Sequence, residues 1–171
     1  MFTKYDNTHI LFTVGSYTVR VLNLVREDSC RTIPNHTHGD NSYEIHYICD
    51  GCGQAQIDRR SYDLTPGTLY VVGAFIEHSQ TPCPDDRMHE YCIHIHFQRK
   101  KSAEKQNNSK ETEYLLSLFE QTFFWFGSDK QNLFPCICEL FRCVERKTPG
   151  YQFEAEAFLR QILIRVIRNY L

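Results

Sequence analysis

The sequence has no excess of basic charge. Its 171 residues contain 19 Lys and Arg against 21 Asp and Glu, which gives a net charge of −2 and an isoelectric point near 6.4. A chain that binds duplex DNA needs a basic face to neutralise phosphates and often carries a helix-turn-helix pattern, which the sequence also lacks. We therefore expect that residues 1–171 alone do not bind DNA specifically.

Long apolar runs are missing as well. No stretch reaches membrane-spanning length, and the amino terminus, Met1–Asn7, has no apolar signal core. No internal repeat or low-complexity tract appears, and the length suffices for one sizeable hydrophobic core. These absences predict a cytoplasmic protein without a membrane partner.

Cysteine, in contrast, is abundant, but its spacing is uninformative. Only Cys49 and Cys52 have the C-x-x-C spacing of a zinc ligand pair, and no second matching pair exists. A zinc site and a disulfide scaffold are therefore both weakly supported. We expect reduced thiols, buried as small apolar groups, at positions 30, 49, 52, 83, 92, 136, 138 and 143.

Runs rich in Val, Ile, Thr and Tyr between glycine or polar turns predict a mainly β amino-terminal part. The expected strands are Ile10–Val14, Tyr17–Val25, Tyr43–Cys49, Gln54–Arg59, Thr68–Val72 and His89–Phe97. In the last strand Cys92, His94 and His96 share one face, but the pattern does not decide which face looks inward. Residues Met1–His9 are either an arm that folds over the mouth of a barrel or a frayed terminus.

Polar residues are concentrated among these strands. His36 and His38 point to one face of their strand, and Glu44 and His46 share a face of the next. Glycine turns then reverse the chain, so His78 can return to the neighbourhood of the first pair. A sheet that closes on itself would bring these polar groups together.

The spacing His36-x-His38-x5-Glu44-x6-Gly51, followed by Pro66-Gly67 and His78, resembles a cupin barrel. More narrowly, it resembles the sensor domain of AraC-type transcription regulators. The gap before the glutamate is longer than in metal-binding cupins. In addition, the proline, glycine and asparagine of that pattern are replaced by Gly73, Phe75 and Pro82.

The resemblance implies a double-stranded β-helix, or jelly-roll, barrel in residues 1–98 that binds a small polar effector such as a sugar. The implied ligand-binding residues are His36, His38, Glu44, His46 and His78. A divalent metal such as Fe, Mn, Zn or Ni would suit His36, His38, Glu44 and His78, because imidazole and carboxylate are ligands for these ions. The alternative is that they form a polar lining that hydrogen-bonds hydroxyl groups of the effector directly, or that they are interior histidines whose hydrogen bonds are satisfied within the protein.

No nucleophile with a base and an orienting group can be assigned from the spacing of the residues. We therefore expect no enzymatic activity. The competing hypothesis is a small metal-dependent cupin enzyme, such as an isomerase or a dioxygenase. The helices predicted after the barrel argue against it, since a stand-alone barrel has little need of them.

The remaining sequence predicts a polar linker at 99–110 and about three helices in 111–171. The first opens at a capping box of Asn108 and Glu111 and includes the aromatic run Phe123–Phe126. The second begins near Asn132 and ends at 148–150, and the third is the amphipathic segment Gln152–Leu171.

Apolar residues are spread too widely around the third helix for a single contact to cover them. We therefore predict that residues 111–171 form a homodimer through Leu159, Ile162, Leu163, Val166 and Tyr170. The alternative is a monomer in which the other two helices cover these groups. The resemblance also implies a helix-turn-helix region beyond Leu171, so DNA would be a partner only through a region absent from these residues.

Overall fold

The computed structural model describes residues 2–29, 31–100 and 109–171. Its strands are β1 Phe2–Asp6, β2 Leu11–Val14, β3 Tyr17–Ser29, β4 Ile33–His36, β5 Ser42–Asp50, β6 Gly53–Ile57, β7 Arg60–Leu64, β8 Thr68–Val72, β9 His78–Pro82, β10 Met88–Arg99 and β11 Phe124–Ser128. Its helices are α1 Lys110–Gln121, α2 Phe134–Arg146 and α3 Tyr151–Tyr170. The predicted mainly β fold with three carboxy-terminal helices is confirmed.

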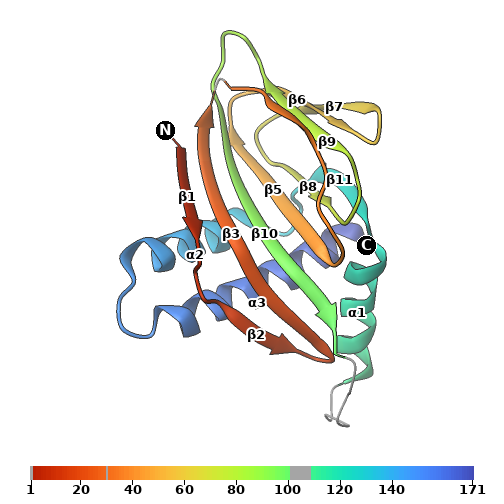
Figure 1. The fold of residues 1–171 in the computed structure, drawn as a ribbon, viewed down its shortest axis with the longest axis vertical. Helices are drawn as coiled ribbons and strands as arrows, with labels where there is room; N and C mark the ends of the chain where they lie inside the picture. The colour runs from red at the N-terminus through yellow and green to blue at the C-terminus, as the bar shows by residue number, and fades with distance from the viewer. Residues whose placement is uncertain (1, 30, 101–108) are drawn as a thin grey trace.

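The strands form two antiparallel sheets that face each other. The large sheet has the order β1-β3-β10-β5-β8-β11, with β2 also paired to β3, and the small sheet has the order β4-β9-β6-β7. Figure 1 shows the small sheet lying over β5 and β8, with α2 and α3 behind the large sheet. The cupin-like barrel is therefore confirmed as well.

Alternate residues of the large sheet enter two different environments. Ile45, Ile93 and Phe97 belong to the larger hydrophobic core, which they share with the three helices. On the opposite face, Cys92 and His94 look into the barrel, which settles the orientation that the strand pattern left open. A smaller apolar cluster fills part of the barrel interior with Ile48, Ala55, Ile57, Leu64, Tyr70, Val72 and Met88.

The helical extension contributes a strand to the barrel. Helix α1 begins after Ser109, whose hydroxyl accepts a hydrogen bond from a backbone N–H of the first turn, and it ends at Gln121. Asn108, the expected cap, lies outside the described residues, as does most of the predicted linker. The helix predicted over Phe123–Phe126 is wrong: Phe124–Ser128 is β11 and pairs with β8, as aromatic residues favour strands.

The amino-terminal segment forms the edge of the large sheet. Strand β1 pairs antiparallel with β3, from Phe2 opposite Glu27 to Asp6 opposite Asn23. The segment is therefore an ordered edge strand and not a frayed terminus. It lies alongside the open side of the barrel (Figure 1).

The interface role predicted for α3 is not supported by its packing. Leu159, Ile162, Leu163 and Val166 are at most 2% exposed and belong to the core between α3, α2 and the large sheet. Tyr170 is partly buried against the same core. A dimer interface cannot use the first four residues, because the chain's own elements already cover them.

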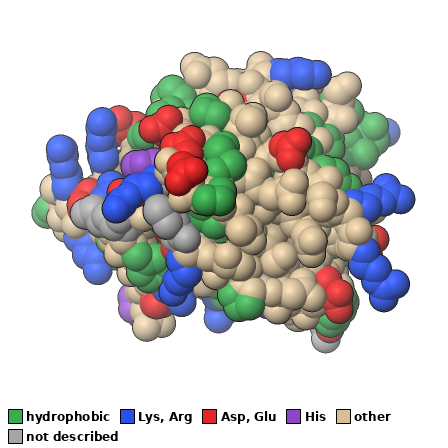
Figure 2. Space-filling model, turned by 90° about the horizontal axis from the view of Figure 1, so that it is seen from above, with side chains coloured by type: hydrophobic (Ala, Val, Ile, Leu, Met, Phe, Trp, Pro, Cys, Tyr) green, Lys and Arg blue, Asp and Glu red, His purple; other side chains and the backbone are tan. Residues whose placement is uncertain are grey.

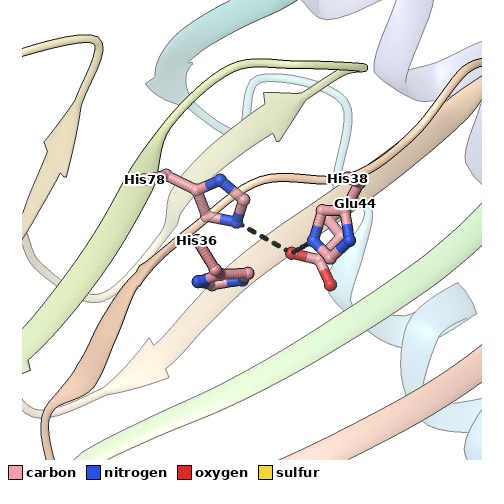
Figure 3. A group of neighbouring side chains, drawn as sticks. All are labelled: His36, His38, Glu44 and His78. Carbon is pink, nitrogen blue, oxygen red and sulfur yellow. Dashed lines mark hydrogen bonds and ion pairs between the residues drawn. The ribbon is translucent and has the colours of Figure 1, made fainter.

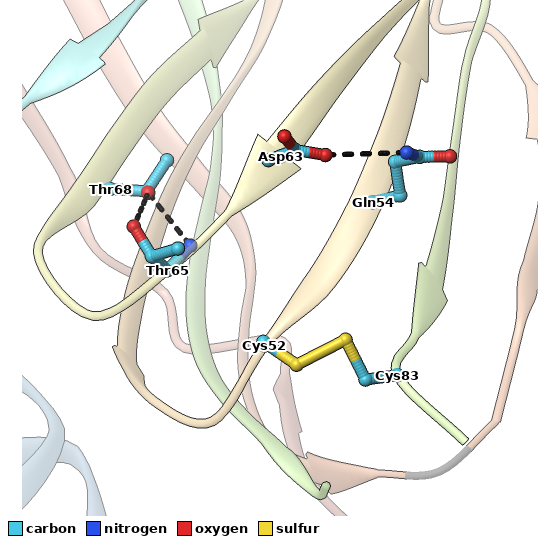
Figure 4. Close-up of a disulfide and its surroundings, with 6 residues drawn as sticks. All are labelled: Cys52, Gln54, Asp63, Thr65, Thr68 and Cys83. Carbon is cyan, nitrogen blue, oxygen red and sulfur yellow. Dashed lines mark hydrogen bonds between the residues drawn. A yellow bond between two sulfur atoms is a disulfide. The ribbon is translucent and has the colours of Figure 1, made fainter. Parts of the chain in front are cut away.

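One pair of cysteines forms a disulfide. Cys52, in the turn before β6, is bonded to Cys83, just after β9, with a Cα–Cα distance of 5.5 Å (Figure 4). The prediction of reduced cysteines is therefore wrong for this pair, because the antiparallel pairing of β6 with β9 brings the two residues together. Free thiols remain at positions 49, 92, 136, 138 and 143, whereas Cys30 lies outside the described residues.

Two further observations concern the surface charge and the hydrophobicity of the helices. On the face that Figure 2 shows, Lys and Arg side chains are spread around the edge rather than gathered into one patch. None of the helices within residues 2–29, 31–100 and 109–171 combines the length and hydrophobicity needed to cross a membrane.

Candidate functional site

A cavity of about 360 Å³ lies between the two sheets. The large sheet contributes Glu44, His46 and His94, and the small sheet contributes His78 and Gln80. Strand β1 adds its own side chains at the edge, namely Phe2 and Lys4. The cavity is therefore bounded by both sheets and by the amino-terminal strand.

The four residues predicted to bind a metal converge in this cavity (Figure 3). His36 ends β4, His38 follows it in a loop, Glu44 lies on β5 and His78 begins β9. One ligand atom from each lies within 4.8 Å of the others. His36 and His78 are also cross-strand partners, so the pairing of β4 with β9 fixes their separation.

Glu44 is the centre of this cluster. Its Oε2 lies 3.1 Å from Nε2 of His38, of His46 and of His78. Burial by itself would raise the pKa of Glu44, but the three imidazoles outweigh it, and the pKa of this carboxyl is strongly lowered. The carboxylate is therefore ionised.

Two of the histidines are oriented by backbone carbonyls. His36 Nδ1 donates to the carbonyl oxygen of Pro34 at 2.9 Å, and His78 Nδ1 donates to that of Ile76 at 3.0 Å. A carbonyl oxygen only accepts, so Nδ1 of each ring carries a proton; in neutral His36 the Nε2 atom then keeps a lone pair. Burial lowers the pKa of His36, which favours that neutral form.

His38 supplies an unsatisfied polar atom. Its Nε2 is buried and makes no aligned hydrogen bond with any described residue, although it lies close to Glu44. Three imidazole nitrogens and one carboxylate, two of the rings held through Nδ1, are the donor set and outer hydrogen bonds of many divalent-metal sites. The residues present therefore fit a divalent metal.

His46 lies deeper in the cavity and has a different environment. Its Nδ1 lies 2.5 Å from Glu90 Oε1, and its ring stacks on that of Tyr70 with centroids 4.3 Å apart. Burial would lower the pKa of His46, but the acidic side chains around it, those of Cys92, Tyr70 and Glu90, raise it well above its usual value. His46 is therefore the positively charged partner of the buried acids.

The sequence of the chain was compared with models of known protein families. The sequence model of the AraC-like ligand binding domain matches residues 25–163, which is most of the chain. The chain belongs to this family. A comparison of this chain with curated protein sequences found no match.

Solved structures of cupin type are similar to it at low identity. A cupin protein from Bacteroides fragilis has 17% identity and a TM-score of 0.43, over 66% of this chain and 86% of that one. YhaK from Escherichia coli has 8% identity and a TM-score of 0.48, over 77% of this chain and 52% of that one. The bacterial pirin YhhW from Escherichia coli, solved in complex with nickel(II), has 15% identity and a TM-score of 0.39, over 60% and 59%.

The AraC-like domain also contains cavity residues that the sequence did not predict. Glu90, Cys92 and His94 share the inward face of β10, and Gln80 lies two residues after His78 on β9. Strand alternation from His94 to Glu90 could have identified the first three once the inward face was known. Gln80 was missed because no strand was expected between Val72 and His89.

His94 is held as a neutral ring. Its Nε2 lies 2.6 Å from Ser42 Oγ, and its Nδ1 lies 3.1 Å from the amide nitrogen of Asn23. The amide nitrogen donates, so His94 Nδ1 accepts and the proton is on Nε2. Burial lowers the pKa of His94 to about 4, so this imidazole stays neutral at physiological pH.

Proposed function

We propose that this AraC-like domain is the effector-sensing part of a transcription regulator and that a small polar metabolite, such as a sugar, binds in its cavity. One observation carries the proposal: polar side chains from two sheets converge on one cavity. Its volume of about 360 Å³ lies within the roughly 300–1,000 Å³ typical of small-molecule sites. Glu44 and the histidines around it offer acceptors and donors for the hydroxyl groups of such a molecule.

Strand β1 provides a link from the bound molecule to the rest of the protein. Phe2 and Lys4 line the cavity, while the backbone of β1 pairs with β3 at the edge of the sheet. A ligand that contacts these side chains would change the stability of an edge strand. Such a difference between the free and bound states is what a sensor requires.

A divalent metal is part of the proposal. His36, His38, Glu44 and His78 would hold it, and it would supply a Lewis-acid site for an oxygen atom of the effector. Elemental analysis of protein purified without chelator should find a stoichiometric metal in the wild type. His36→Ala and His78→Ala should each contain about one metal equivalent less than the wild type, and an unchanged metal content in both variants would contradict the assignment.

The function is tested by thermal unfolding in the presence of a panel of monosaccharides and related polyols. A binding compound at 100 times its dissociation constant stabilises the native state by about 2.7 kcal/mol, which raises the melting temperature by several degrees. The double substitution of His38 and Glu44 by alanine should abolish the shift. The matched control is His96→Ala, on β10 outside the cavity, and an unchanged affinity in the double variant would place the site elsewhere.

We further propose that the domain is a homodimer that uses the outward side of α3. Phe153 is 80% exposed there, and Ile164 is partly exposed. Sedimentation equilibrium at micromolar concentration should give a dimer for the wild type and a monomer for Ile164→Glu. A wild-type monomer would contradict this part of the proposal.

DNA binding is assigned to a region beyond Leu171, and the protein is assigned to the cytoplasm. A fluorescence anisotropy titration of residues 1–171 with duplex DNA should show no sequence-selective binding, because the net charge is only −2. We also propose that the domain has no catalytic activity. The alternative of a metal-dependent cupin enzyme, such as an isomerase or a dioxygenase, is favoured only if the metal-loaded domain converts one of the compounds that stabilise it.

A further inference from the structure

A second set of metal-ligating side chains lies on the cavity face of the large sheet. Glu44 and His46 on β5 and Cys92 on β10 each offer one ligand atom, and these three atoms lie within 4.8 Å of one another. Cys92 and His46 are direct cross-strand partners. All three residues are only 5–7% exposed. A carboxylate, an imidazole and a thiolate are the three donor types that zinc binds in proteins.

The imidazole of His46 is oriented by a hydrogen bond to Glu90. Glu90 Oε1 lies 2.5 Å from His46 Nδ1, and the same oxygen accepts a hydrogen bond from Gln80 Nε2 at 2.9 Å. Because an ionised carboxylate only accepts, the proton between them belongs to Nδ1. His46 Nε2 is then directed at Glu44, 3.1 Å away. A carboxylate behind a histidine is the usual support of a metal-binding imidazole.

We propose that Glu44, His46 and Cys92 form a second metal position, which takes a thiophilic divalent cation such as Zn²⁺ and shares Glu44 with the three-histidine position. Three protein ligands leave the fourth tetrahedral place open for water or for a group of the cavity ligand. The thiolate separates this position from the first one, whose imidazole and carboxylate donors also suit harder ions such as Mn²⁺.

The charges balance when the metal binds. The Sγ–H bond of Cys92 breaks and an Sγ–metal bond forms, while the proton goes to solvent. His46 releases its Nε2 proton in the same way, so two protons leave as one dication enters. The net charge of Glu44, His46, Glu90 and Cys92 together with the metal is therefore the same after binding as that of the four side chains before it.

Cobalt(II) is the probe that tests the proposal, because a Co²⁺–thiolate bond absorbs in the near ultraviolet whereas nitrogen and oxygen ligands alone do not give that band. Metal-free protein with its disulfide intact is titrated with Co²⁺ under anaerobic conditions. The wild type and His36→Ala should both develop the thiolate band, and Cys92→Ser should lose it. Cys136→Ser, which removes a buried thiol outside the cavity, is the matched control and should keep it.

Zn²⁺ affinity measured by competition with a chromogenic chelator gives the second readout. Glu90→Gln should weaken Zn²⁺ binding by about 10–100-fold, as expected for a positioning residue, while the thiolate band with Co²⁺ is retained. Cys92→Ser should weaken Zn²⁺ binding at least as much and should also remove the band.

Two results would overturn the proposal: Co²⁺ bound by the wild type without a thiolate band, or a band that persists in Cys92→Ser. If Cys92→Ser does not fold, cadmium NMR of the wild type decides, since a shift in the range of nitrogen and oxygen ligands alone would refute the thiolate bond. Effector binding is measured separately by thermal unfolding with monosaccharides. The second metal position can therefore fail while the sensor function stands.

Discussion

In the large sheet, strands β5 and β8 bury residues on both faces, whereas in the small sheet β6 alternates buried and exposed residues and β7 is mostly exposed. Three helices pack on the outer face of the large sheet. The small sheet has the disulfide between Cys52 and Cys83 at the end of its two central strands, β6 and β9. The covered sheet can therefore hold buried ionised groups such as Glu44 on its inner face, because its outer face supplies a large apolar core.

The comparison also explains where the cavity lies. Glu44, His46 and His94 come from the covered sheet, and His78 and Gln80 come from the small one. A molecule bound in the cavity therefore contacts two sheets that are stabilised by different means. The large sheet depends on packing against the helices, and the small sheet depends on the disulfide.

The largest loss of stability is expected from a substitution in α3, which packs on the outer face of the large sheet. Leu163→Asp puts an unpaired charge at a site that is 2% exposed and should cost at least about 4 kcal/mol in the free energy of unfolding. Urea denaturation followed by circular dichroism measures it. Gln152→Asp on the same helix, at an exposed site, is the control and should change stability by no more than about 0.5 kcal/mol. Equal losses in both variants would contradict the observed packing of α3.

The next effect concerns the small sheet. The disulfide links residues separated by 31 positions, and closing a loop of this length stabilises a protein by about 3–4 kcal/mol. The double variant Cys52→Ser, Cys83→Ser should lose this amount in denaturation measurements. Cys138→Ser, which removes a free thiol, should lose much less, and a reductant should have no further effect on the double variant. Full stability in that variant would show that backbone pairing alone holds the small sheet.

A pH titration tests the inner face of the large sheet. Burial lowers the pKa of His94 from 6.5 to about 4, so between these values the unfolded chain binds a proton that the folded chain does not. Stability should therefore fall as the pH decreases from 6.5 to 4, and His94 should account for up to about 3 kcal/mol of the loss. The difference in unfolding free energy between wild type and His94→Gln, measured across this range, isolates the contribution. A difference that does not vary with pH would rule out a buried neutral His94.

The smallest effect is expected on the exposed face of the small sheet. Gln54 Nε2 donates to Asp63 Oδ1 at 3.3 Å across the β6–β7 pair (Figure 4). Because both groups are exposed to water, Gln54→Ala should change the free energy of unfolding by less than about 0.5 kcal/mol. A loss above 1 kcal/mol would mean that this face is covered in solution.

Sequence patterns predicted the barrel and the centre of the site because both depend on local periodicity. The spacing of His36, His38, Glu44 and His78 and the glycine turns were sufficient to expect convergence. The inward face of β10 could not be decided, since one face carries histidines and a cysteine and the other carries bulky apolar groups. Only packing against the helices resolves that choice.

Other errors arose where tertiary pairing competes with local preference. The run Phe123–Phe126 follows a helix and continues its apolar pattern, but β8 offers an unpaired edge that β11 completes. The disulfide was missed because Cys52 and Cys83 are distant in sequence and meet only when β6 pairs with β9. The burial of α3 depends on how α2 lies across it, which no single-helix pattern contains.

The disulfide also changes the covalent topology of the chain. Residues 52–83 form a closed ring that contains the β6–β7 hairpin, whose tip at Asp58 and Arg59 is exposed. A single tryptic cut after Arg59 would open this ring without releasing a fragment, because Cys52 and Cys83 still join the two parts. The cut protein would migrate as one chain on a denaturing gel without reductant and as two with it. Limited proteolysis of the purified protein therefore shows whether the disulfide between Cys52 and Cys83 is formed.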